Sequence, residues 1–164
     1  MKIESTLINR SGQTLNVTYY DIDQEKELDN KKVRGVHAYC FCGDKLVIVY
    51  AEAKGYWTPP GGGVEAGESI EEAVAREILE ETNMRVVRQE FIGYQDIFEP
   101  DKINTQTRHI CLVEPVGEFI SDPDGDVTEI KLVDPKNLKQ YFDWGVIGDR
   151  LLKRALEKFP KLKI

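Results

Sequence analysis

The stretch GGVEAGESIEEAVAREILEETNM, residues 62–84, decides the fold because it joins a glycine-rich loop to a helix with two marked ends. Ser69 and Glu72 have the spacing of a capping box, in which each side chain accepts a hydrogen bond from the other residue's backbone N–H. At the far end, Asn83 tolerates the left-handed conformation of a helix cap. These signals predict a helix over about 70–82.

Three glutamates gather near the end of this helix. Glu77, Glu80 and Glu81 lie at i, i+3 and i+4, so they share one face, where like charges repel. The negative end of the helix dipole adds to their cost. At about 100° per residue their arc overlaps the apolar stripe that contains Ile78. Partly buried carboxylates do not stay charged without a partner. A divalent cation such as Mg²⁺ or Mn²⁺, which prefers oxygen ligands, supplies that partner.

Short apolar and β-branched runs on both sides of the helix predict strands. They cover 2–9, 14–21, 33–42, 45–53, 86–98, 107–116 and 127–134. The Gly- and Pro-rich stretch 55–68 and the charged stretch 23–32 are expected to be loops. A short helix is expected at 135–142 and an amphipathic helix at 144–159. A glycine loop that feeds one helix between strands predicts an α/β sandwich with a mixed sheet.

The first 22 residues form a predicted N-terminal β-hairpin around the turn signal RSGQ. This hairpin either extends the sheet or builds the interface of a homodimer, and the sequence leaves both open. With 164 residues, the chain has the usual size of one domain, so residues 1–164 are expected to fold as a single unit.

Composition narrows the function classes. The formal net charge of -7 argues against a nucleic-acid partner, which usually meets a basic face. No apolar run is long enough for a membrane span, and the N-terminus lacks the apolar region of a secretion signal. The three cysteines, Cys40, Cys42 and Cys111, are an odd count and are expected to be buried, reduced thiols. A cytoplasmic protein that acts on a small molecule is therefore expected.

Residues 62–84 resemble the Nudix box, the signature G-x5-E-x7-R-E-U-x-E-E-x-G-U of Nudix hydrolases, in which U is a bulky aliphatic residue. The matching positions are Gly62, Glu68, Arg76, Glu77, Ile78, Glu80, Glu81 and Met84. Asn83 stands where the family has glycine, which affects only the geometry of the helix end. The resemblance implies an α/β/α sandwich and an enzyme that requires a divalent metal. Such enzymes hydrolyse a nucleoside diphosphate linked to another moiety, usually at a P–O–P bridge.

The resemblance also implies roles for the residues of the box. Glu77, Glu80 and Glu81 match the metal-binding glutamates, and Gly62 lies where a backbone carbonyl often joins the metal shell. Mg²⁺ is the expected cofactor, with Mn²⁺ as a substitute. Glu68 and Arg76 match a structural pair that clamps the loop to the helix.

The general base varies within the family. A box glutamate at Glu77 or Glu81 is one candidate. An acid outside the box is the other, and Glu129 is the first choice because it begins EIKLV, which resembles the family's late strand. Glu99 and Asp101 are weaker candidates of the same kind.

The rest of the substrate site is thinly marked in the sequence. Basic and aromatic residues near the expected cleft are candidates for phosphate contact or base stacking. They are Arg34, Lys54 and Arg108 for phosphates, and Trp57, Tyr94 and Phe98 for stacking on a base. The two histidines, His37 and His109, are read as strand residues with satisfied hydrogen bonds. The substrate stays open among nucleoside triphosphates, ADP-ribose, nucleotide-sugars, dinucleoside polyphosphates and capped RNA.

Two alternatives to a nucleotide hydrolase remain. One is a Nudix-like domain that binds nucleotides for regulation without turnover; such domains usually lose box carboxylates, and all are present here. The other is an isomerase of isoprenoid diphosphates, which needs a catalytic cysteine. Cys40 or Cys42 could fill that role, but the box has the hydrolase form.

Overall fold

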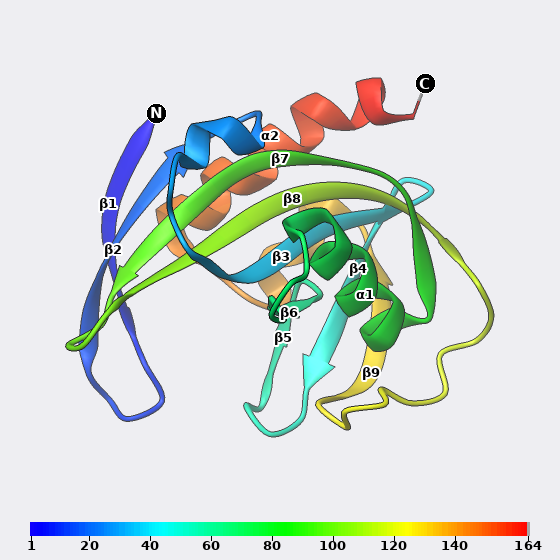
Figure 1. Ribbon diagram of the computed structural model, residues 1–164. Coiled ribbons are helices and arrows are strands. Elements are labelled where there is room, and N and C mark those ends of the chain that lie inside the picture. The colour runs from blue at the N-terminus through cyan, green and yellow to red at the C-terminus, as the bar shows by residue number, and fades with distance from the viewer. Residues whose placement is uncertain (164) are drawn as a thin grey trace.

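The computed structural model describes residues 1–163, which form one mixed nine-stranded sheet between helices (Figure 1). The strands are β1 (Lys2–Ile8), β2 (Thr14–Asp21), β3 (Val33–Cys42), β4 (Lys45–Ala51), β5 (Tyr56–Thr58), β6 (Gly61–Gly63), β7 (Met84–Phe98), β8 (Ile103–Pro115) and β9 (Val127–Val133). The helices are α1 (Ile70–Thr82), α2 (Gly145–Leu162) and the short 3-10 turns η1 (Glu25–Leu28) and η2 (Pro135–Gln140). The predicted α/β/α sandwich with a mixed sheet is confirmed.

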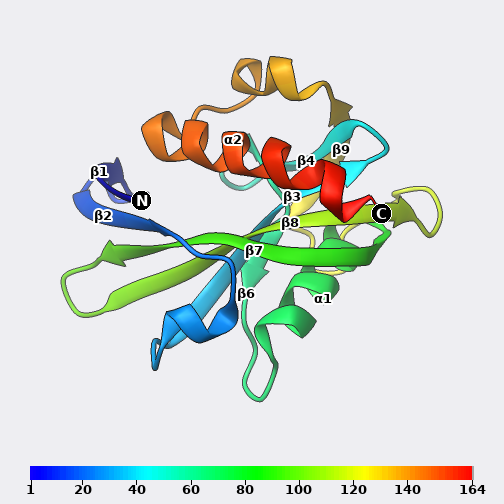
Figure 2. The ribbon, with the colours of Figure 1, turned by 90° about the horizontal axis from the view of Figure 1, so that it is seen from above.

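The strand order is β1-β2-β7-β8-β3-β4-β5, with β6 paired to β3 and β9 paired to β4. Only β3 and β8 run parallel among the described strand pairs, so the sheet is mixed at its centre. Helices α1 and α2 lie on opposite sides of this centre (Figure 2). Strand β3 therefore contacts both cores and carries side chains to each.

Each helix builds its own hydrophobic core on the sheet. Successive side chains of a strand point to opposite faces. Val36 and Cys40 of β3 accordingly pack in the cluster that contains Ile78 of α1. Phe41, one residue further on, packs in the cluster of α2, where its ring stacks on Phe159 at 3.9 Å between centroids. This alternation tells which face each later side chain occupies.

The N-terminal hairpin extends the sheet, because residues 16–21 of β2 pair with residues 93–98 of β7. Among the described residues, four ion pairs tie the end of β2 to α2. Asp21 pairs with Arg150 at 2.6 Å and with Arg154 at 3.6 Å. Asp23 pairs with Arg154 at 2.9 Å and with Lys158 at 2.8 Å. The hairpin thus widens the sheet and holds α2 across it.

The ends of α1 agree with the sequence prediction. Ser69 and Glu72 form the reciprocal capping box, and Asn83 adopts the left-handed cap conformation at φ 55 and ψ 36. The bounds Ile70–Thr82 match the predicted range, so local signals were enough to define this helix.

The expectation that 55–68 is only loop is wrong, because the stretch contains strands β5 and β6. Strand β6 pairs with residues 35–37 of β3, and this pairing depends on glycine. A Cβ on Gly61 would lie 2.1 Å from the carbonyl oxygen of Val36, so any side chain there would force the strands apart. The charged stretch 23–32 likewise contains the 3-10 turn η1.

Cys40 and Cys111 are buried free thiols, as the sequence predicted. Cys42 is also a free thiol but is only partly buried, which differs from the prediction. Within residues 1–163, neither long helix combines the length and apolar character that crossing a membrane requires.

Two leucines of α2 provide a matched test of this packing. Leu151 is fully buried, whereas Leu156 is 43% exposed. We expect Leu151→Ala to lower the free energy of unfolding by about 2–5 kcal/mol, because it removes buried methyl groups and leaves a cavity. Leu156→Ala should change it by less than about 0.5 kcal/mol. Urea denaturation of both variants checks this, and similar losses in the two would contradict the position of α2.

Candidate active site

A strand of three glycines lies directly against the glutamates of α1. The Gly61 N–H donates a 2.8 Å hydrogen bond to the Glu81 carboxylate. A Cβ on Gly62 would lie 2.5 Å from the carboxyl carbon of Glu77. Glycine is therefore required at position 62 for the backbone of β6 to approach the carboxylates this closely.

Arg76 joins the loop before α1 to the helix. Its guanidinium binds both oxygens of Glu68, at 2.7 and 2.9 Å, and donates to the carbonyl oxygen of Gly63 at 2.8 Å. A bidentate pair of this kind is strong and fixes direction. The pairing lowers the pKa of Glu68 to about 2. The structure thus brings together Glu68 and Arg76, the two residues that the box resemblance pairs.

The same guanidinium also contacts the predicted metal ligands. Its Nη1 lies 2.9 Å from Glu77 and 3.3 Å from Glu80. Within residues 1–163, Arg76 is the only cation that forms an ion pair with any of Glu77, Glu80 and Glu81. Several carboxylates therefore share a single positive charge.

Burial and mutual repulsion raise the pKa values of these three glutamates. Burial is the largest cause for each of them. For Glu81 the pKa rises to about 8, because the negative charges of Glu77, Asp122 and Asp126 add to burial and outweigh the Gly61 hydrogen bond. A carboxyl group that resists ionisation at this level marks a site that lacks positive charge.

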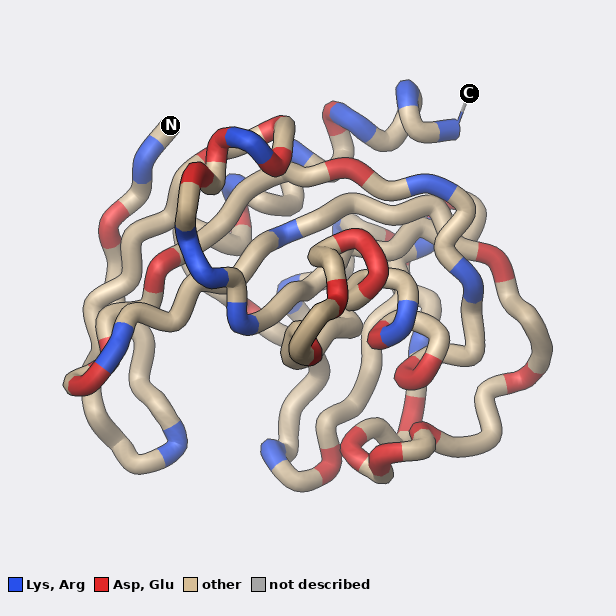
Figure 3. The backbone as a smooth tube through the Cα atoms, in the orientation of Figure 1, with Lys and Arg blue, Asp and Glu red and all other residues tan. Residues whose placement is uncertain are grey.

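The loop before β9 adds acidic residues to the site. From the sequence, this stretch was predicted only to be a turn. Asp122, Asp124 and Asp126 act on the pKa values of the box glutamates, so they lie near them. Figure 3 shows acidic positions at the lower end of α1 and in the loop below it. Asp122 is buried and accepts hydrogen bonds from the backbone N–H groups of Asp124 and Val127. In the sequence, the acids that alternate in DPDGD, residues 122–126, were the signal that could have identified this acidic loop.

Glu129 points to the other face of the sheet. It pairs with Tyr50 across β4 and β9, and the next residue, Ile130, packs against the core on the α1 side. Because side chains alternate, Glu129 faces away from α1 and is exposed. The structure therefore does not bring Glu129 onto the face of the box glutamates. The register of β9 on β4 decides which face Glu129 occupies, and a sequence motif does not report that register. Glu99, a weaker candidate, pairs with Lys102 at the β7–β8 turn.

The candidates for substrate contact are divided between surface and core. Arg34 is exposed beside β6, and its carbonyl oxygen accepts the Val64 N–H at 3.0 Å. Lys54 is exposed in the turn between β4 and β5. Trp57 is half-buried with its ring 5.3 Å from that of Tyr50. Arg108, in contrast, is only 3% exposed and lies on the central strand β8.

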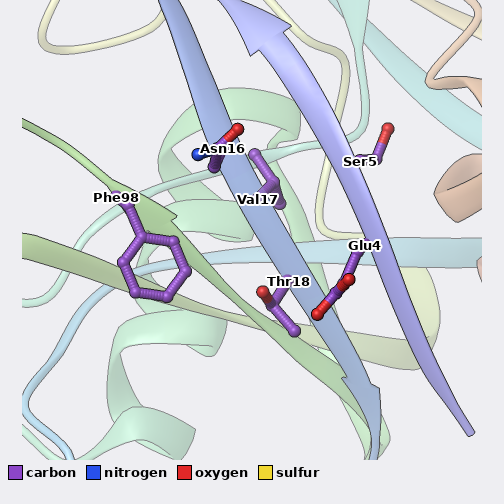
Figure 4. Close-up of a pocket in the computed structure, with 6 residues that line it drawn as sticks. All are labelled: Glu4, Ser5, Asn16, Val17, Thr18 and Phe98. Carbon is purple, nitrogen blue, oxygen red and sulfur yellow. The ribbon is translucent and has the colours of Figure 1, made fainter.

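Two aromatic candidates and a surface hollow lie elsewhere. The Tyr94 ring stacks on Tyr20 at 5.0 Å, which occupies its face. Phe98 lines a hollow of about 530 Å³ with Glu4, Asn16 and Thr18 (Figure 4). Because this hollow is formed by the N-terminal hairpin and the end of β7, it contains none of the box residues.

A family model for the NUDIX domain matches residues 31–155. The chain belongs to the Nudix family of hydrolases. The predicted resemblance and the predicted class, a hydrolase that acts on acid anhydrides, are thereby confirmed.

The relatives differ in how much of each chain they cover. YtkD of Bacillus subtilis (strain 168), which carries a provisional 8-oxo-dGTP diphosphatase name, is 30% identical over 151 residues, covering 89% of this Nudix chain and 91% of YtkD. The uncharacterized Nudix hydrolase YvcI of the same strain is 36% identical over 50 residues, only 32% of its length. An ADP-ribose pyrophosphatase of Methanocaldococcus jannaschii is 34% identical over 91 residues, or 53% of its length.

Among solved structures, the Bacillus subtilis pyrophosphohydrolase BsRppH (E68A mutant) is similar with a TM-score of 0.74 and 20% identity. The match covers 94% of this Nudix chain and 97% of BsRppH. At this identity the likeness shows that the fold is shared over nearly the whole length.

The raised pKa of Glu81 gives stability a defined pH dependence without metal. In the unfolded chain this carboxyl ionises near its ordinary value of 4.5, and in the folded state at about 8. Its favourable contribution is therefore complete below pH 4.5 and is lost as the pH rises through about 8. We expect Glu81→Gln to melt higher than the parent protein at pH 8 in EDTA, and at nearly the same temperature at pH 5.

Thermal melts at these two pH values check this prediction. The glutamine keeps an acceptor for the Gly61 N–H, so the comparison isolates the charge. A gap in melting temperature that is the same at pH 5 and pH 8 would contradict the raised pKa of Glu81.

Proposed function

We propose that this protein is a Mg²⁺-dependent hydrolase that cleaves a phosphoanhydride bond in a nucleoside diphosphate linked to another group, with Mn²⁺ as a substitute. The observation that carries the proposal is the set of three glutamates beside β6: all have raised pKa values, and two of them, Glu77 and Glu80, share one guanidinium. Among the possible substrates, we propose nucleoside triphosphates as the preferred class. The relative YtkD, matched over most of both chains, supports this choice by its name.

The donor chemistry of the site fits a hard divalent cation. Carboxylate and carbonyl oxygens are the ligands that Mg²⁺ prefers. The proposed ligands are the Gly62 carbonyl and the carboxylates of Glu77, Glu80 and Glu81. The backbone of β6 also fits a metal site, because only a glycine at position 62 leaves room beside the Glu77 carboxylate.

The side chains proposed as metal ligands are not already gathered around one point. Within residues 1–163, no three acidic, histidine or cysteine side chains already converge as a metal site. Glu77 and Glu80 instead turn toward Arg76, at 2.9 and 3.3 Å. The clamp on the loop uses other nitrogens of Arg76: Nε and Nη2 hold Glu68 and the Gly63 carbonyl, so it does not depend on the Nη1 contacts to Glu77 and Glu80.

When bound, the cation supplies positive charge to the diphosphate oxygens and acidifies water. The residues of the chain do the remaining work. Glu77 or Glu81 accepts the proton of the attacking water, and the water attacks phosphorus in line with the leaving phosphate. For an acid outside the box, Asp124 and Asp126 are better candidates than Glu129, because both repel the box glutamates whereas Glu129 faces the opposite side of the sheet.

Isosteric glutamine variants test the roles of the glutamates. We expect Glu77→Gln and Glu81→Gln each to lower kcat by about 100-fold or more, because each removes a charge that holds the metal or accepts the proton. Glu71→Gln is the matched control: Glu71 is exposed on the first turn of the same helix and should keep turnover within about two-fold. Product analysis by chromatography on a nucleotide panel, with and without Mg²⁺, gives the rates.

Folding of each variant is checked by circular dichroism, so that lost turnover is not lost structure. Wild-type rates in both glutamate variants would remove the proposed metal site. Tight nucleotide binding with no hydrolysis by the parent protein would favour the regulatory alternative.

A further inference from the structure

Arg108 is a buried cation without an acidic partner. It is 3% exposed, and no ion pair to it exists within residues 1–163. Its Nη1 donates to the carbonyl oxygen of Thr107 and its Nη2 to the Gln106 side chain, both at 3.1 Å. Its Nε–H has no partner in the part of the chain that the structure describes. Burying a charge with only neutral partners is costly, so a purely structural position would favour a neutral side chain.

His37 lies beside Arg108, as its register partner on the neighbouring strand β3. Arg108 Nη1 is 3.4 Å from His37 Nδ1. A guanidinium can only donate, so Nδ1 accepts and the imidazole proton lies on Nε2. Burial and the charge of Arg108 hold the pKa of His37 well below its ordinary value, so the ring stays neutral. His37 therefore presents an N–H donor next to those of Arg108.

Trp144, just before α2, completes the group. The guanidinium carbon of Arg108 lies 5.1 Å from the centroid of the Trp144 ring, and the His37 ring meets that ring edge-on at 5.8 Å. We call His37, Arg108 and Trp144 the Arg108 cluster. His37 and Trp144 are partly exposed, so they form the part of the cluster that solvent reaches, with Arg108 behind them.

Strand β6 stands between this cluster and the glutamates. Gly61 pairs with His37, and its ideal Cβ position points at the imidazole ring, 2.7 Å from Cδ2. The next residue, Gly62, points at Glu77 on the opposite face. Neighbouring strands lie about 4.8 Å apart. A substrate whose diphosphate lies at the glutamates can therefore place its other end against the Arg108 cluster.

We propose that the Arg108 cluster binds the base of the substrate and selects 6-oxopurines, such as guanine and hypoxanthine, over adenine and pyrimidines. This inference rests on the proposed function, because it assumes a nucleotide substrate. Two N–H groups of the cluster have no partner among the described residues, Nε2 of His37 and Nε of Arg108. A 6-oxopurine presents two adjacent acceptors, O6 and N7, that such donors can meet. Adenine presents an amino donor at the same edge, which would oppose another donor. The Trp144 ring adds a surface for stacking.

A phosphate-binding role for Arg108, the expectation from sequence, makes a different prediction. Phosphates are common to all nucleotides, so the loss of a phosphate contact would weaken the binding of every nucleotide equally. Arg108 also lies on the α2 face, as shown by its contact with Trp144, whereas the glutamates lie on the α1 face. The base is therefore the part of the substrate that this cluster meets.

Steady-state kinetics with GTP, ITP, ATP and CTP test the proposal on the full chain. The parent protein should prefer GTP and ITP over ATP by about 10-fold or more in kcat/KM. Arg108→Gln should lose about 10- to 100-fold with GTP and ITP, mainly in KM, and stay within about three-fold with ATP. Arg108→Lys keeps the charge but removes the unpaired Nε–H, and should also lose the preference. Arg85→Gln, at a 64% exposed arginine, is the matched control and should change nothing.

Binding of GMP and AMP without metal, measured by calorimetry, provides a readout that is independent of turnover. GMP should bind more tightly than AMP to the parent protein and to Glu77→Gln, and this difference should vanish in Arg108→Gln. If Arg108 variants do not fold, His37→Gln and Trp144→Leu replace them, with the same expected loss of preference.

The outcomes separate this inference from the proposed function. Hydrolysis of all four nucleotides without base preference, or an equal loss for all of them in Arg108→Gln, would overturn the base site and leave the hydrolase standing. Selective GMP binding without any Mg²⁺-dependent hydrolysis would support the base site and overturn the proposed function.

Discussion

The close approach of a side-chain-free strand to buried carboxylates is the constraint on which the site depends. Strand β6 donates the Gly61 N–H to Glu81 and leaves no space for a side chain between Gly62 and Glu77. This contact requires that α1 begin where it does, and that the loop before it be held firmly. The capping box at Ser69 and the Arg76–Glu68 clamp meet these two requirements.

Charge is distributed unevenly about β6, and the unevenness has a chemical meaning. On the α1 face, the loop 122–126 helps to raise the pKa values of the helix glutamates, and Glu77 and Glu80 share one guanidinium. On the α2 face, Arg108 is buried without an acidic partner among residues 1–163. Hydrophobic cores under both helices hold these groups in place despite the electrostatic cost. Each face thus lacks the charge or the hydrogen-bonding partner that a nucleotide with its cation would bring.

The sequence was informative wherever the cause of structure was local. The ends of α1, the shared face of Glu77, Glu80 and Glu81, and the N-terminal hairpin all follow from spacing within a few residues. What it missed depends on which strands become neighbours. Strand β6 forms because β3 offers it an edge, Glu129 faces away because of the register of β9 on β4, and Arg108 is buried because β8 is central. The spacing of residues within one segment does not predict which strand that segment pairs with, or in which register.

The most direct test of the central claim is anomalous diffraction from crystals of the protein soaked in Mn²⁺. We predict one or more anomalous peaks between the Gly62 carbonyl and the carboxylates of Glu77, Glu80 and Glu81, with Glu77 and Glu80 turned away from Nη1 of Arg76. Crystals that take up Mn²⁺ elsewhere, or not at all, while both carboxylates remain on Arg76, would contradict the claim that these acids form a seat for a divalent cation.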